Sequence, residues 1–288
     1  RLSQKDDAEP GLAKQVLDAH GLFAMPGLID MHVHACFDPD APLSSAHRGN
    51  ESDGVKVLRA AHNLGKALSY GITTVRDLGA PLGVAISAKK GWSRGLFEGA
   101  RPIVAGPMIT AIGGHGTEKG EEMGLEVCGP EDIRRQVRIL ASSGVDVIKL
   151  AVSGAVVRTA LAPDEIKAAV DEAHACNLLV AVHAHFRAQD ISMSVASGAD
   201  TIEHGCVLED ETIEAMSRQG TFLCPTITPF MRIIESPDAF GGRNSRFVST
   251  AQTILETHRK GLTKAYRAGV RIIAGTDAGM PLVGFGDL

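Results

Sequence analysis

Two histidines that stand two residues apart are the most informative feature of the sequence. His32 and His34 close an apolar run that begins at Gly27. Side chains at positions i and i+2 of a β-strand point to the same side, so both imidazoles leave one strand end together. Neutral imidazole is the commonest metal ligand in proteins. The pair predicts two ligands for one metal ion, although a single strand-end histidine is more often a polar residue satisfied by the backbone.

Further residues that can bind a metal recur at the ends of later apolar runs. His183 and His185 close one run, His204 closes the next, and Asp277 follows the last. Lys149 lies inside another run. Imidazole and carboxylate groups from four strand ends suit Zn²⁺ or a similar divalent ion. Taken singly, Asp277 also fits the N-cap of a following helix and Lys149 a buried lysine paired with an acid.

Short apolar runs alternate with helical patterns from Leu28 onward, which is typical of repeated βα units and a parallel sheet. Pro130 and Pro163 open two of the helical patterns and are followed by acidic residues, a typical helix start. The eight predicted strands cover residues 28–34, 73–78, 101–105, 146–152, 178–184, 201–204, 222–226 and 271–276. The predicted helices cover residues 53–70, 84–90, 130–143, 163–177, 190–197, 210–219 and 246–268.

Eight βα units predict an α/β fold of the (β/α)8 TIM barrel type over residues 27–288. A doubly wound open sheet is the main alternative, but the chain lacks the glycine-rich phosphate loop that usually accompanies it. The eighth strand has no helix after it, so we expect the barrel to be incomplete after strand eight. Residues 1–26, with a short extended stretch at 14–18, are interpreted as the remnant of a small β domain.

The composition limits the kinds of partner that the protein is expected to bind. The net charge is −5 and aromatic residues make up 4% of the chain, and both values disfavour a nucleic-acid partner. No apolar run is long enough to cross a membrane. The five cysteines are odd in number and form no C-x-x-C pair, which predicts reduced thiols and a cytoplasmic location. Because the first residue is Arg1, we expect missing segments at the ends, and an upstream signal peptide stays open. A homo-oligomer is compatible with this composition.

The order of the motifs resembles the amidohydrolase superfamily, whose members are (β/α)8 metal-dependent hydrolases. Within it, the local sequences are similar to the imidazolonepropionase-related branch, and there to its prolidase and carboxypeptidase-like binuclear members. The sequences that carry the resemblance are residues 26–34, 71–77, 113–115, 202–205 and 275–279. Imidazolonepropionase itself has no lysine ligand, so Lys149 argues against that activity.

The resemblance implies two divalent metal ions, which we expect to be Zn²⁺. One would be bound by His32, His34 and Asp277, and the other by His183 and His204. Between the two histidines of strand five, His183 is chosen because family members keep the ligand at the first position.

The lysine and the remaining histidines have further roles by the same resemblance. Lys149 would react with CO₂ to form a carbamate that bridges both ions. His115 and His185 would hold the carbonyl or carboxylate of the substrate, with His115 also acting in catalysis.

The expected activity is hydrolysis of an amide (peptide-like) bond in a small molecule, such as a dipeptide or an N-acyl amino acid, through a hydroxide that bridges the metals. Asp277 would accept the proton of this hydroxide and deliver it to the departing amine. The alternatives are hydrolysis of a lactam, carbamate, ester or ring amidine, and a metal-binding barrel without activity.

Overall fold

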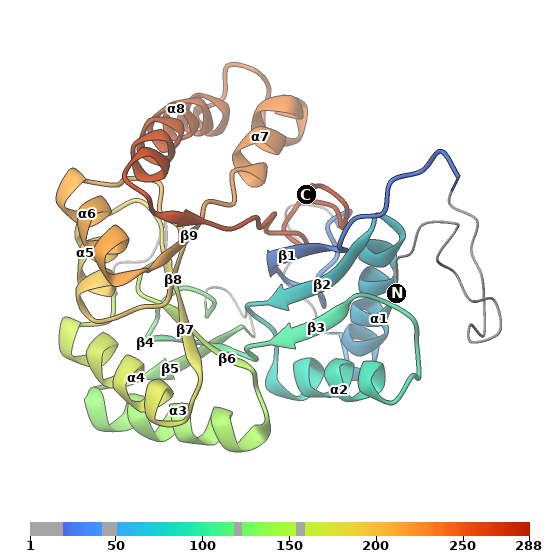
Figure 1. Cartoon of the computed structure of the whole chain (residues 1–288), viewed down its shortest axis with the longest axis horizontal. Coiled ribbons are helices and arrows are strands. Elements are labelled where there is room, and N and C mark those ends of the chain that lie inside the picture. The colour runs from blue at the N-terminus through green and yellow to red at the C-terminus, as the bar shows by residue number, and fades with distance from the viewer. Residues whose placement is uncertain (1–19, 42–50, 118–122, 154–158) are drawn as a thin grey trace.

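The computed structural model describes residues 20–41, 51–117, 123–153 and 159–288. It has the predicted α/β fold, and all of its strand pairs are parallel (Figure 1). The smaller sheet has the order β1 (Leu28–Val33), β2 (Ile72–Asp77), β3 (Arg101–Val104). The larger sheet has the order β10 (Arg271–Ile272), β9 (Phe222–Cys224), β8 (Thr201–His204), β7 (Leu179–Ala184), β6 (Val147–Ala151), β4 (Met108–Ala111), β5 (Gly124–Val127).

Helices flank both sheets. In Figure 1, α1 and α2 lie beside the smaller sheet, α3 to α6 lie along the larger one, and α7 and α8 form a pair beyond β9. The helices are α1 (Asp53–Ser69), α2 (Leu82–Ser93), α3 (Pro130–Ser143), α4 (Pro163–Ala175), α5 (Ala188–Ala196), α6 (Asp210–Gln219), α7 (Thr228–Glu235) and α8 (Arg246–Arg267), with a 3₁₀ turn η4 (Pro237–Phe240).

The helix ends follow local chemistry. α3 begins at Pro130, whose missing N–H is not needed in the first turn, and carries two acidic residues there, which suits the positive end of the helix dipole. The residue that caps the end of α3 is Gly144, which has a φ of +92°. The cap of α6 is Gly220, with a φ of +77°. These left-handed caps stop each helix and turn the chain into the next strand, as the glycine pattern predicts.

All eight predicted strands are present, but the prediction missed β4, β5 and α7. β4 and β5 have four residues each, and the segment between them contains several glycines, so neither has a long alternating pattern. The last predicted strand is shorter than expected. Only Arg271–Ile272 pairs with β9, because the chain then turns to the edge of β1, where Met31 N–H donates to the carbonyl of Ala274 at 2.9 Å.

Hydrogen bonds join both edges of the smaller sheet to segments that adjoin the outer and inner strands β10 and β6 of the larger one. At the β1 edge, the Met31 bond is followed by one from the N–H of His34 to the carbonyl of Ala278 at 2.7 Å. At the β3 edge, Asp146 donates its N–H to the carbonyl of Val104 at 2.8 Å and accepts the Val104 N–H on its carboxylate at 3.0 Å. From β6 to β10 the strands follow chain order, without the reversal of a doubly wound sheet.

The core is divided between the two sheets. One apolar cluster packs β6 to β9 against α3 to α6, and another packs β1 and β2 against α1 and α2. Among the described helices, none is both long and apolar enough to cross a bilayer. Of the expected small β domain, residues 1–19, including the extended stretch at 14–18, lie outside the described residues.

Candidate metal centre and active site

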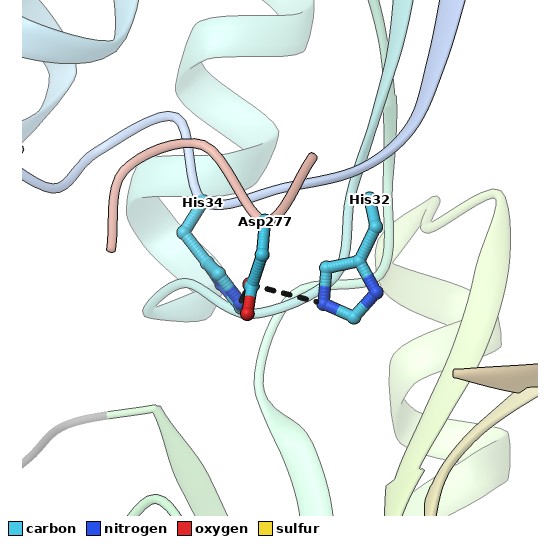
Figure 2. Close-up of side chains that lie close together, drawn as sticks. All are labelled: His32, His34 and Asp277. Atoms are coloured by element: carbon cyan, nitrogen blue, oxygen red, sulfur yellow. Dashed lines mark ion pairs between the residues drawn. The ribbon is translucent and has the colours of Figure 1, made fainter. Parts of the chain in front are cut away.

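The histidine pair of β1 faces a carboxylate that follows β10 (Figure 2). His32 lies within β1 and His34 directly after it. Their Nε2 atoms lie 3.4 and 3.3 Å from Oδ1 of Asp277. All three residues are buried, and their donor atoms lie within 4.8 Å of one another. Two imidazole nitrogens and a carboxylate oxygen form a donor set for a divalent ion such as Zn²⁺.

Asp277 reaches this position from an unusual backbone conformation. Its φ is +65°, in the left-handed region that residues other than glycine rarely adopt. Its N–H donates to the carbonyl of His32 at 2.8 Å, which holds the segment against β1. Gly275 permits this approach, because a Cβ there would lie 2.9 Å from the Cβ of His32. No helix follows in the described residues 278–288, so the N-cap alternative for Asp277 is wrong.

The second ring nitrogen of each histidine has its own partner. Nδ1 of His32 lies 2.7 Å from Oε2 of Glu203, and Nδ1 of His34 lies 3.1 Å from the carbonyl oxygen of Gly79. Both partners accept, so each Nδ1 carries the proton and donates it. Each Nε2 then presents a lone pair to Asp277, whose Oδ1 has no hydrogen-bond partner. Three acceptor atoms face one another, an arrangement that a cation between them would stabilise.

Glu203 anchors this arrangement from β8. Its side chain has no exposed surface. Besides the His32 ring, its carboxylate accepts from Nη2 of Arg76 at 2.7 Å and from the hydroxyl of Thr201 at 2.6 Å. Burial opposes ionisation of Glu203, but Arg76 and His32 outweigh it, so the pKa lies below its ordinary value. The carboxylate is therefore a fixed anion that orients the His32 ring.

A second pair of histidines closes β7 and β8. Nε2 of His204 lies 2.8 Å from Nδ1 of His183, and Nδ1 of His204 lies 2.6 Å from the hydroxyl of Thr226. His204 and Thr226 both have a positive φ, +69° and +41°. Nε2 of His183 is buried and has no partner. Within the described residues, these two histidines have no third histidine, cysteine or carboxylate donor that completes a metal-binding group.

The remaining predicted histidines lie against this pair. The ring centroid of His115 is 4.5 Å from that of His183, and the centroid of His185 is 4.6 Å from that of His204. The two halves of the site meet where the rings of His32 and His204 approach to 5.0 Å. The structure thus gathers all six histidines of the predicted site into one contiguous cluster, although their roles as ligands or substrate contacts stay predictions.

Lys149 is fully buried in β6, and its Nζ has no hydrogen-bond partner. It forms no ion pair within 4.0 Å in the part of the chain that the structure describes, so the alternative of a lysine paired with an acid is wrong. Burial lowers its pKa to about 8, against the opposing effects of Glu203 and Asp277. A buried amine with this pKa is neutral more often than an ordinary lysine.

Burial also sets the charge of the imidazoles. It lowers the pKa of His32 to about 4 and that of His185 to about 3, and it holds His183 and His204 well below their ordinary value. The rings are therefore neutral at pH 7, the form that binds metals. Burial opposes ionisation of Asp277, but the net effect of its charged surroundings, Lys149 among them, holds its pKa below the ordinary value.

Sequence reasoning missed the residues that support the predicted ligands. Glu203 and Arg76 are charged residues of opposite sign inside two predicted strands of a parallel sheet, where charged residues are buried only when paired, and this signal could have identified them as a buried pair. Cys224 forms a further group with His32 and Glu203, all within 4.8 Å. Thr226 has no distinguishing pattern, because its role depends on the position of His204 in space.

Comparisons with known proteins give the same family as the motifs. Residues 23–284 match the model of the amidohydrolase family. Ochratoxinase from Aspergillus niger is 29% identical over 286 residues, and the alignment covers 88% of this chain and 57% of that enzyme. The chain thus spans little more than half of this relative.

Two solved structures are similar along most of the chain. The structure of a Xaa-Pro dipeptidase with bound methionine has a TM-score of 0.77 and 29% identity. The alignment covers 91% of this chain and 67% of the dipeptidase chain. The structure of an amidohydrolase has a TM-score of 0.81 and 27% identity, with coverages of 98% and 71%. The clustered histidines, Asp277 and the matched family model together identify the chain as a member of the amidohydrolase family.

Proposed function

We propose that the protein is a metal-dependent hydrolase that cleaves the amide bond of a small substrate, such as a dipeptide or an N-acyl amino acid. The convergence of His32, His34 and Asp277 on one point carries the proposal. The names of the similar proteins, a Xaa-Pro dipeptidase and an ochratoxinase, support the substrate class.

The two sheets would form one (β/α)8 barrel in this proposal. The hydrogen bonds at both edges of the smaller sheet support closure, as does the chain order of β6 to β10. The carboxyl ends of all barrel strands would then open on one face, where such barrels bear their active sites.

The proposal includes two divalent ions, expected to be Zn²⁺, and the donor group of His32, His34 and Asp277 supports the first of them. His32, His34 and Asp277 would hold one ion, and His183 and His204 the other. The unpartnered Nζ of Lys149 supports its conversion to a carbamate, in which the neutral amine bonds to the carbon of CO₂ and releases a proton. The resulting anionic oxygens would bind both ions. When bound, such ions polarise a carbonyl and make water more acidic.

The side chains of the chain itself would handle the substrate and the protons. Asp277 is ionised, so its carboxylate can take a proton from the attacking water and return it to the leaving amine. His115 and His185 lie beside the pair His183 and His204, where their rings can orient the carbonyl or carboxylate of the substrate.

Metal analysis and a hydrolysis panel test the proposal. We expect two metal ions per chain, cleavage of dipeptides or N-acyl amino acids, and loss of this activity with a chelator. In Asp277→Asn we expect turnover to fall by about 10²- to 10⁴-fold, the range for a general acid–base group, while the fold is kept. Cleavage of lactams, carbamates or esters alone would refute amide hydrolysis and assign the protein to those substrates. Bound metal without any turnover would refute an enzymatic function.

A further inference from the structure

An apolar cleft of about 860 Å³ adjoins the histidine cluster. Its size and its largely apolar lining are those of small-molecule pockets. The walls include Phe186 and Phe230 on one side and Phe247, Thr250 and Ile254 of α8 on the other. The cleft therefore lies among α7, α8 and the segments that follow β7 and β8.

The first wall is continuous with the histidine cluster. Phe186 comes three residues after His183, and its ring stacks on that of His185 with the centroids 3.7 Å apart. The centroid of Phe230 lies 5.6 Å from that of His185. A molecule held at His185 would thus have apolar rings next to it that lead into the cleft.

The second wall offers exposed apolar surface and a cation. Phe247 is 69% exposed and adds aromatic surface to this wall. Arg246 also lines the cleft, and it makes no ion pair with any other residue that the structure describes. An apolar cleft with one available guanidinium suits a ligand that has an apolar body and a carboxylate.

We propose that this cleft is the specificity pocket for a large apolar side chain of the substrate. The inference rests on the proposed amide hydrolysis, because the cleft would take one side chain while the scissile bond lies at the histidine cluster. The preferred substrates would be dipeptides or N-acyl amino acids with an aromatic or branched aliphatic residue.

Neighbouring positions of α8 provide a matched pair of variants. Thr250 is exposed and lines the cleft, whereas Ser249 is exposed and does not. Thr250→Trp fills the cleft, and Ser249→Trp adds the same side chain outside it. Phe247→Ala removes a wall residue that is too exposed to be needed for folding.

Kinetics with Phe-Ala, Ala-Phe and Ala-Ala test the pocket. In the unmodified protein and in Ser249→Trp, kcat/KM for at least one phenylalanine dipeptide should exceed that for Ala-Ala by about tenfold or more, as expected for burial of an aromatic side chain. Thr250→Trp should abolish most of this preference, and Phe247→Ala should reduce it. Equal preference in all four proteins, or none in any, would overturn the proposal.

Binding of 3-phenylpropanoate, followed by calorimetry, separates the two proposals. If no dipeptide is cleaved but this probe binds to the unmodified protein and to Ser249→Trp and not to Thr250→Trp, the pocket stands and amide hydrolysis fails. If the dipeptides are cleaved without preference and the probe does not bind, amide hydrolysis stands and the pocket is overturned. A dimer that Thr250→Trp dissociates in sedimentation would assign the cleft to a contact between two copies and overturn the pocket.

Discussion

Replacement of Glu203 by glutamine tests the support of the histidine pair most directly. The carboxylate has no exposed surface and accepts from Arg76, His32 and Thr201 at 2.6–2.7 Å. The amide has the same shape but only one acceptor oxygen. If that oxygen keeps the His32 bond, the NH₂ group faces the guanidinium of Arg76, and donor then meets donor.

The expected loss of stability follows from the buried charge that is left behind. Arg76 is 5% exposed, so its guanidinium loses its anion in an environment where water replaces it poorly. Breaking a buried pair by removing one partner costs about 3–5 kcal/mol of unfolding free energy. A freed His32 ring also lowers metal affinity, by about 10- to 100-fold for partners that orient a ligand.

Denaturant unfolding and a metal titration against a competing chelator measure both effects. Glu172→Gln is the matched control, because Glu172 pairs with Arg138 at 2.6 Å between the helices α3 and α4 and with none of the predicted ligands. The Arg138 side chain is 67% exposed, so loss of this pair should change the unfolding free energy little. Equal stability and equal metal affinity for the two variants would refute the orienting role of Glu203.

Two further substitutions address other parts of the site. Gly79→Ala should lower metal affinity, because the new Cβ would lie 2.9 Å from two atoms of the His34 ring. Gly83→Ala in α2 is the control and should leave metal affinity unchanged. A metal titration compares the two variants. Lys149→Met should bind fewer metal ions. It should not lose unfolding free energy, because it removes a buried amine that has no hydrogen-bond partner. Metal analysis that still finds two ions would contradict the bridging role of Lys149.

The sequence predicted the fold well where patterns are long or have clear ends. α3 and α6 begin and end where predicted, because proline, acidic residues and glycine mark their limits. β4 and β5 were missed because four-residue strands between glycines have no periodicity to detect. α7 was missed for a related reason, since its eight residues were assigned to the loop after the seventh predicted strand.

The candidate site was predicted as a set of residues but not as a geometry. His32 and His34 share a strand, so their common direction follows from the strand period. Their distance to Asp277 depends instead on residues more than 200 positions later that hydrogen-bond to β1. The pairing of His183 with His204 was also beyond sequence patterns, because it depends on the orientation of the rings, and Thr226 fixes that of His204 from a third segment.

The candidate metal centre lies at the seam between β1 and the segment that follows β10. The N–H of Asp277 donates to the carbonyl of His32, and the N–H of His34 donates to the carbonyl of Ala278. The same two backbone bonds that attach this segment therefore place the carboxylate opposite both imidazoles. Asp277 is held at a positive φ in the process, so part of the favourable energy of the seam offsets backbone strain. A cation shared by the three side chains would bind both sides of the seam, and its affinity would add directly to the stability of the joint.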